Sequence, residues 1–346
     1  MRRLALGAAA FAAVFAILHA CGRDGPATPS YDRSQVVVAT VRRVIAPAYV
    51  EFEERAEALE AATRAWASDP TPANLEATRT AWREARAAWK WTEAFDFGPA
   101  DDAHVNSNLD FWPAIPDRIE ARLAEPRPLD QLGATERGLP VLEYLLFGPA
   151  GGDPVRRTAY VVLLAGDVVA QARFLRGAWE GEYGADFATA GSGSRSYPTV
   201  ESAVVRIVYR MAQLVRKAAD LKLGRPLGHR TGGAPQPETV ESRFSEGSIA
   251  DLISNFEGLE RLYVDGGLSD LVRTLDPALD ARVRAAVGEV LAAVRSIPAP
   301  LSRTVESDPE KGEVAFRAVK ALEHVLTVDL KGALGLGFEF RDTDGD

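Results

Sequence analysis

An acidic side chain lies within a stretch that otherwise reads as an apolar helix. Residues 138–148, GLPVLEYLLFG, carry Glu143 on the face that a helix would share with leucines. A buried carboxylate is costly unless it is paired, so we expect a partner nearby. Arg86 and Glu93 lie at the edge of another apolar helical face, and we expect Arg86 to pair with Glu143 or Glu93. The alternative is that both acids are solvated at a helix margin.

A second set of polar side chains lies in the last third of the chain. It comprises Arg243, Ser245, Ser248 and Asn255, and Asn255 shares a helical stripe with leucines. Polar groups that are buried there must find hydrogen bonds. Two interpretations stay open: serines that cap a helix beside a satisfied core Asn255, or a ligand-facing wall at a domain interface.

These side chains must be positioned by helices, because the apolar periodicity is helical almost throughout and no stretch alternates long enough for a strand. Thr71-Pro72 is a typical helix start, followed by a stripe with Trp82 and Trp89. Proline is accepted in the first turn of a helix and costly in its interior, so we expect a helix to begin near Leu139–Pro140 or to restart there with a kink. We expect the other long helices at 34–67, 154–181, 199–222, 248–264, 277–296 and 309–331, and short helices within the irregular region 96–135.

The fold class predicted from this pattern is all-α, with two packed up-and-down helical bundle domains. The Gly- and Ser-rich stretch at 181–198 is the best boundary. We therefore expect an N-terminal bundle at 34–190 and a C-terminal bundle at 191–346. A polar tether should precede them at 21–33.

The N-terminus has the pattern of a secretory signal over residues 1–20: two arginines, a short apolar run and a small residue before Cys21. Residues 18–21, LHAC, resemble the lipobox of bacterial lipoproteins, in which Cys21 would carry the lipid. An ordinary signal peptide is the alternative. The resemblance implies a lipid-anchored protein of the cell envelope that faces the periplasm, and Gly22 favours the outer membrane. Cys21 is the sole cysteine, so no intrachain disulfide can form.

The charge of the chain argues against nucleic-acid binding. The 346 residues carry a formal net charge of −9, and removal of the signal takes away two arginines and no acid, which gives −11. Non-specific nucleic-acid binding depends on Lys and Arg that neutralise phosphates. We therefore expect no nucleic-acid partner.

Several separated motifs together resemble the imelysin-like family, and more narrowly its predicted bacterial periplasmic lipoprotein branch. They are AWREARAAWKWTEAFDFGP (81–99), DFWP (110–113), GLPVLEYLLFG (138–148), KLGRPLG (222–228), ESRFSEGSIADLISNFEGLERLY (241–263) and GFEFRDTDGD (337–346). The resemblance implies a two-domain, all-helical fold with a site at the domain cleft. It also implies an envelope location and an association with iron acquisition.

Some members of that family are described as metallopeptidases with a Gly-x-His-x-x-Glu motif. Alignment on Gly138 and Glu143 places Pro140 where that His would stand, and proline has no donor atom for a metal. No HExxH motif or CxxC pair replaces it. Glu143 and His104 are the remaining metal candidates, with iron or zinc as the implied ion.

We therefore expect a non-catalytic, lipid-anchored envelope protein that binds a ligand, a metal species or a partner in the interdomain cleft, with a link to iron uptake implied by the resemblance. Its expected partners are the membrane, through the lipid, and envelope components of iron uptake. Two alternatives stay open: a zinc- or iron-dependent imelysin-type metallopeptidase, and a structural envelope protein without a small ligand.

Overall fold

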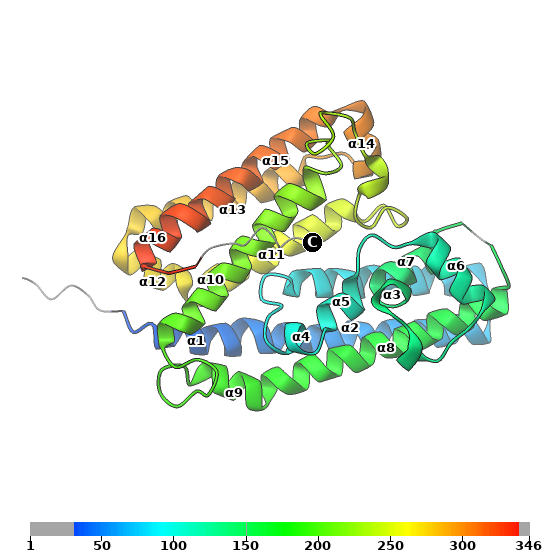
Figure 1. Ribbon diagram of the computed structural model, residues 1–346, viewed down its shortest axis with the longest axis horizontal. Helices are drawn as coiled ribbons and strands as arrows, with labels where there is room; N and C mark the ends of the chain where they lie inside the picture. The colour runs from blue at the N-terminus through cyan, green and yellow to red at the C-terminus, as the bar shows by residue number, and fades with distance from the viewer. Residues whose placement is uncertain (1–30, 150, 339–346) are drawn as a thin grey trace, which may run out of the picture. The chain divides into compact units, whose positions relative to one another are not determined.

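The computed structural model describes residues 31–149 and 151–338, and these residues contain helices and loops but no strand (Figure 1). The chain from Asp32 onward forms one compact unit. The expected signal segment, Cys21, most of the tether and the last eight residues lie outside the described residues. The all-α fold class is confirmed.

The first group of helices is built around a long antiparallel pair. α8 (Pro154–Glu180) packs along α2 (Ala46–Ser68), α3 (Pro72–Thr92) also packs along α2, and α7 (Leu139–Phe147) contacts both α3 and α8. The shorter helices are α1 (Ser34–Ala39), α4 (Pro99–Asp102), α5 (Val105–Asp110), α6 (Pro116–Ala124) and α9 (Glu182–Ala188). α8 is long and apolar enough to pass for a membrane span, but half of its most apolar window is buried inside the protein, as in a core helix.

The second group follows along the chain. α13 (Pro277–Arg295) packs against α11 (Ser248–Val264) and α15 (Pro309–His324), and α10 (Val200–Lys217) packs against α15. The shorter helices are α12 (Leu268–Leu275), α14 (Leu301–Ser307) and α16 (Lys331–Leu334). The predicted division into bundles at residue 190 stays a prediction.

In the part of the chain that the structure describes, three helical segments change to π-helical hydrogen bonding for a short stretch, at Thr40–Ile45, Ala218–Leu223 and Val325–Leu330. In the second of these, Gly224 N–H donates to the carbonyl oxygen of Ala219, five residues back. A π turn accommodates one residue more than an α turn, and such turns are frequent at functional sites.

The sequence signals for helix starts are confirmed. Thr71 caps α3, since its Oγ1 accepts a hydrogen bond from Asn74 N (3.3 Å), and Pro72 is the first helical residue. α7 begins at Leu139, so Pro140 lies in its first turn. Gly138, with φ of 86°, makes the entry possible, because a Cβ there would lie 2.5 Å from the carbonyl oxygen of Leu109.

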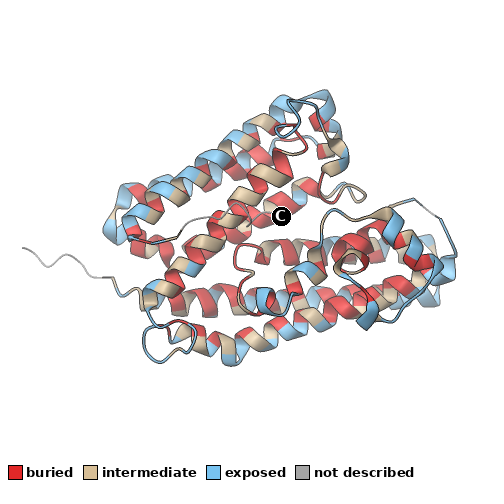
Figure 2. Ribbon diagram, viewed as in Figure 1, coloured by how far each residue is buried: buried red, intermediate tan, exposed pale blue. Residues whose placement is uncertain are grey.

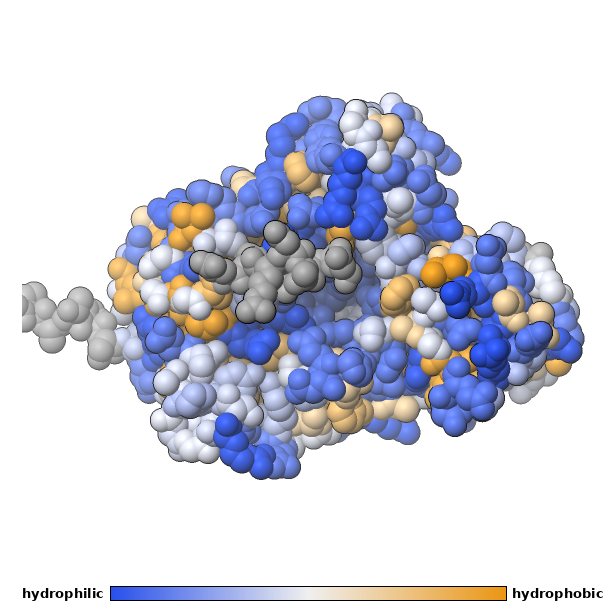
Figure 3. Space-filling model, in the orientation of Figure 1, coloured by the Kyte–Doolittle hydropathy of each residue, from blue (hydrophilic) through white to orange (hydrophobic). Residues whose placement is uncertain are grey.

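The buried core follows the apolar faces of the long helices, while their outer faces are exposed (Figure 2). The face in Figure 3 is correspondingly hydrophilic over much of its area, with separate apolar patches. α3 of the first group and α11 of the second approach each other closely, because a Cβ on Gly258 would lie only 2.1 Å from the carbonyl oxygen of Trp91. This approach brings the charged residues of α3 against those of α11.

Candidate functional site

Charged side chains from distant segments meet beside the contact of α3 with α11. We call them the charged cluster: Arg86, Lys90, Glu93, Asp110, Lys222, Glu241, Asp251 and, as a neutral member, Asn255. Their side chains are almost fully buried. They come from α3, the end of α5, the π-helical stretch after α10, the loop before α11, and the first turns of α11. The fold thus removes an extensive set of opposite charges from water.

Arg86 binds carboxylates from three different segments. Its Nε donates to Asp251 Oδ2 (3.2 Å), its Nη2 to Glu241 Oε1 (3.2 Å), and its Nη1 to Asp110 Oδ1. Burial alone would lower the pKa of Arg86, but the three carboxylates outweigh it and hold the pKa well above its ordinary value.

The expected pairing of Arg86 with Glu143 or Glu93 was therefore wrong. The guanidinium instead binds the acids that the second half of the chain and α5 supply. Glu93 is bound by lysines, and Glu143 by main-chain amides.

Lys90 lies one turn after Arg86 and shares two of its acceptors. Its Nζ donates to Asp110 Oδ2 (2.5 Å), Glu241 Oε1 (2.6 Å) and Glu93 Oε1 (3.2 Å). Burial would raise the pKa of Asp110, but Arg86 and Lys90 outweigh it and hold that pKa below its ordinary value. Asp110 is accordingly ionised at neutral pH.

Lys222 closes the cluster from the π-helical stretch. Its Nζ lies 2.7 Å from Glu93 Oε2, 2.6 Å from Asn255 Oδ1 and 3.1 Å from Glu241 Oε2. Burial lowers its pKa, and the attraction of Glu241 and Glu93 does not fully offset that effect. The pKa values of Glu93 and Glu241 both lie below their ordinary value, because the surrounding lysines outweigh burial.

Asn255 is fully satisfied in the core. Its Nδ2 donates to the carbonyl oxygen of Lys90 (2.7 Å) and to Glu93 Oε2 (2.6 Å), while its Oδ1 accepts from Lys222. The side chain thus ties α11 to the last turn of α3. This geometry matches the satisfied core asparagine of the two interpretations considered from the sequence.

Glu143 is also buried, but main-chain amides bind it in place of a cation. Its Oε1 accepts hydrogen bonds from Phe244 N (2.9 Å), Ser245 N (2.8 Å) and Ser245 Oγ (2.8 Å). Burial raises its pKa to about 7, and the hydrogen bonds from Ser245 oppose that rise. Ser242 Oγ, three residues earlier, donates to Asp251 Oδ2 (2.6 Å), so one loop joins Glu143 to the charged cluster.

The remaining predicted residues lie outside this arrangement or serve local structure. Arg243 is partly exposed, stacks over the ring of Phe244 (4.6 Å to the centroid) and donates to the carbonyl oxygen of Glu238 (3.1 Å). Ser248 is the first residue of α11, and its hydroxyl donates to the carbonyl oxygen of Glu241. His104 is exposed and makes none of the contacts found for Glu143.

The donor set does not fit a zinc or iron centre of the kind that the family resemblance implied. Pro140 offers no donor atom, and Oε1 of Glu143 already accepts three hydrogen bonds. The carboxylates of the charged cluster are bound to Arg86, Lys90 and Lys222. Within residues 31–149 and 151–338, no group of three or more His, Cys, Asp or Glu side chains is placed to hold a metal ion.

Sequence reasoning missed five members of the charged cluster: Lys90, Asp110, Lys222, Glu241 and Asp251. One signal was present, because Lys90 follows Arg86 by four residues and so lies on the same helical face. All five stand in the motifs 81–99, 110–113, 222–228 and 241–263, and Asp110, Lys222 and Glu241 are the first residues of theirs. Nothing local indicated that these motifs meet.

The fold and the site together define an all-helical protein whose two halves are joined by buried, paired charges. A family model described as Imelysin (Peptidase_M75) matches residues 45–328, and the chain belongs to this family. It is similar to Iron-regulated protein A of Synechococcus elongatus, with 30% identity over 329 residues, which cover 91% of this chain and 88% of the relative.

Two solved structures share the fold. One is a putative iron-regulated protein A precursor from Parabacteroides distasonis, with a TM-score of 0.79 and 21% identity, covering 90% of this chain and 96% of that one. The other is an imelysin-like protein from Psychrobacter arcticum, with a TM-score of 0.76 and 16% identity, covering 90% and 99%. The resemblance of the motifs to the imelysin-like family is confirmed, and the narrower resemblance to its lipoprotein branch stays a prediction.

Proposed function

We propose that this protein is a non-catalytic, lipid-anchored envelope protein that binds an iron-containing species where its two halves meet. The similarity to a relative named Iron-regulated protein A supports the link to iron. Membership of the imelysin family supports a shared architecture. At the Gly-x-His-x-x-Glu motif, the side chains of this protein differ from those of the members described as metallopeptidases.

The observation that carries the non-catalytic assignment is the state of Glu143. A metallopeptidase needs a metal-bound water and a general base that can reach it. Here the base candidate is 3% exposed and accepts hydrogen bonds from the amides of Phe244 and Ser245, and the adjacent motif position is Pro140. These contacts hold a loop in place, which suits a structural carboxylate.

Lys217 offers the route by which a ligand could engage the charged cluster. Its Nζ lies 3.0 Å from Glu93 Oε1, yet its side chain is 42% exposed, whereas the side chain of Glu93 is 4% exposed. An amino group at the solvent edge of a buried network attracts anions. Iron bound by polycarboxylates is anionic, so a ferric chelate is the form of iron that this edge would bind.

The runner-up function is an imelysin-type metallopeptidase that depends on zinc or iron. The retention of Glu143, with a pKa of about 7, favours it, because such a value suits a general base. A third possibility is an envelope interaction protein without a small ligand, which the complete internal pairing of Arg86 and Lys90 favours.

A metal and chelate titration of the purified protein separates these functions. We expect no stoichiometric zinc or iron after purification, binding of ferric citrate, and at least threefold weaker binding by Lys217→Gln. Stoichiometric metal that is lost in Glu143→Gln would establish the metallopeptidase alternative and refute the proposal. If ferric citrate did not bind, the remaining function would be that of an envelope interaction protein without a small ligand.

The location is part of the same proposal. The signal pattern at residues 1–20 and the lipobox around Cys21 support a lipid anchor in the envelope, with the outer membrane favoured by Gly22. The proposed partners are the membrane, through the lipid, and envelope components of iron uptake, and no nucleic acid. Incorporation of labelled palmitate that Cys21→Ser abolishes would support the anchor, and unchanged incorporation would refute it.

A further inference from the structure

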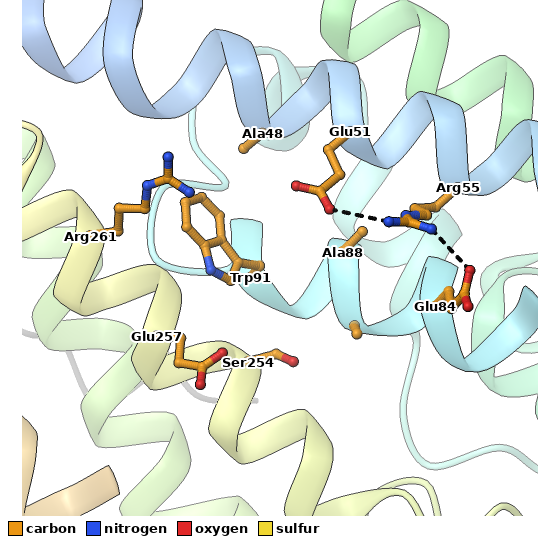
Figure 4. Close-up of a pocket in the computed structure, with 10 residues that line it drawn as sticks. Ala48, Glu51, Arg55, Glu84, Ala88, Trp91, Ser254, Glu257 and Arg261 are labelled. Atoms are coloured by element: carbon orange, nitrogen blue, oxygen red, sulfur yellow. Dashed lines mark hydrogen bonds and ion pairs between the residues drawn. The ribbon is translucent and has the colours of Figure 1, made fainter. Parts of the chain in front are cut away.

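A hollow lies on the opposite side of α3 and α11 from the charged cluster. We call it the Trp91 groove, and it has a volume of about 330 Å³, with walls from α2, α3 and α11 (Figure 4). On α3 it is lined by Glu84, Ala88 and Trp91, whereas Arg86 and Lys90 face the cluster. The volume falls within the range of small-molecule sites.

The groove combines a small-residue floor with one aromatic wall. Ala88 is partly exposed and leaves room that a larger residue would fill. The ring of Trp91 meets that of Phe95 edge to face, with centroids 5.9 Å apart and planes at 78°, which holds the indole in one orientation. The guanidinium of Arg261 lies 5.4 Å from the centroid of the Trp91 ring, so this ring already attracts a cation of the protein itself.

The charges around the groove leave an excess of negative charge. Glu51 on α2 and Glu257 on α11 point into the space beside Trp91 from opposite walls (Figure 4). Arg55 forms ion pairs with two carboxylates at once, since its guanidinium lies 3.0 Å from Glu84 and 3.8 Å from Glu51. Away from that end, the charges cancel: Glu257 pairs with Arg295 (2.6 Å), and Arg261 pairs with Asp265 (2.9 Å). The surplus is therefore one negative charge, on the carboxylates that share Arg55.

We propose that the Trp91 groove binds a small monovalent organic cation, a substituted guanidinium or ammonium. The charged head of the ligand lies against the indole of Trp91, in the place that the Arg261 guanidinium occupies in the structure. Glu51 and Glu257 flank this charged head. The apolar part of the ligand rests on the floor at Ala88. Arg261 is exposed, and its ion pair with Asp265 is a surface pair, so the Arg261 side chain can move aside at little cost.

The space continues along α11 for a longer ligand. A neighbouring hollow of about 630 Å³ shares Trp91, Glu257 and Arg261 with the groove and reaches α13 at Gly288. A Cβ at Gly288 would meet no atom within 4 Å, so neither packing nor backbone conformation requires glycine there. A tail attached to the cation has room to extend in this direction.

Titration with phenylguanidinium and with phenylurea, its neutral counterpart of similar shape, tests the proposal on the full chain. We expect phenylguanidinium to bind with a dissociation constant of about 1 mM or tighter, which is reasonable for about ten non-hydrogen atoms. Phenylurea should bind at least about tenfold more weakly, because it lacks the cation that the ring and carboxylates attract. Calorimetry or chemical-shift changes of the indole N–H groups can measure both.

Three variants assign the binding to the groove. Glu257→Gln should weaken phenylguanidinium binding about three- to tenfold, and Ala88→Leu should abolish it by filling the floor. Glu306→Gln removes an exposed carboxylate of α14 and should leave it unchanged. Equal binding of phenylurea, equal effects of Glu257→Gln and Glu306→Gln, or no binding to the wild-type protein would overturn the proposal. None of these outcomes bears on ferric citrate and Lys217, so the two proposals fail separately.

Discussion

Replacement of Glu143 by glutamine removes a charge while it keeps the acceptor that orders the loop before α11. In the wild-type protein, Oε1 of Glu143 accepts from the amides of Phe244 and Ser245 and from the Ser245 hydroxyl. The side-chain oxygen of glutamine can accept the same three hydrogen bonds. The variant therefore isolates the cost of burying the carboxylate charge.

The magnitude follows from the displaced pKa. Burial raises the pKa of Glu143 from an ordinary value of 4.5 to about 7, so the folded protein holds this proton more tightly than the unfolded chain. Its contribution to stability is present in full below pH 4.5 and is lost as the pH rises to about 7. Each pH unit in that window is worth about 1.4 kcal/mol, which gives a loss of roughly 3 kcal/mol.

Urea titrations of the wild-type protein and Glu143→Gln, from pH 4.5 to about pH 8, measure this loss. We expect the free energy of unfolding of the wild type, relative to the variant, to fall by roughly 3 kcal/mol across the range. Burial also raises the pKa of Asp96 to about 7. Because Asp96 is present in both proteins, its contribution to the pH dependence of stability cancels in the comparison. A difference that stays constant within about 0.5 kcal/mol would refute the reasoning, and Glu306→Gln is the matched control.

Three further substitutions, each read from urea titration, probe the contact of the two halves, an open position on α13 and the charged cluster. Gly258→Ala should lower the free energy of unfolding by about 1–3 kcal/mol, because its Cβ would lie 2.1 Å from the carbonyl oxygen of Trp91. Gly288→Ala should instead raise it by about 0.5–1 kcal/mol, since nothing lies within 4 Å of the new atom. A rise for Gly258→Ala or a fall for Gly288→Ala would contradict the geometry. Arg86→Met should cost about 3–5 kcal/mol, because it leaves buried carboxylates without their cation, and a cost below about 1 kcal/mol would argue against that. Finally, stability should fall below pH 4.5, because the lysines around Glu93 hold its folded pKa well below that ordinary value; a titration that is flat down to about pH 3 would be inconsistent with these ion pairs.

The helices were predictable because their signals are local. Thr71-Pro72 and Pro140 fix helix starts through capping and through the missing N–H of proline, which depend on the nearest few residues. The stripe with Trp82 and Trp89 identified a buried face of α3 for the same reason. Such features require no knowledge of what the helix packs against.

The partners of the buried charges could not be predicted in this way. The acceptors of Arg86 lie 24, 155 and 165 residues away along the chain, and no periodicity connects positions that far apart. Glu143 was misread for a different reason: we looked for a side-chain cation, and the fold supplied main-chain amides of Phe244 and Ser245. Backbone donors satisfy a carboxylate without leaving any mark on the amino-acid sequence.

The π-helical stretch at Ala218–Leu223 ties the position of Lys222 to the length of the chain. It contains one residue more than an α-helix needs to cover the same turn, so it can be regarded as an α-helix with a single insertion. Deletion of one residue there would restore α-helical hydrogen bonding and rotate Lys222 by about 100° relative to α10, away from Glu93 and Asn255. Relatives that lack the inserted residue would need a cation from elsewhere to balance Glu93. In an alignment of the family, a one-residue gap near 218–223 should therefore occur together with a change of charge near Glu93.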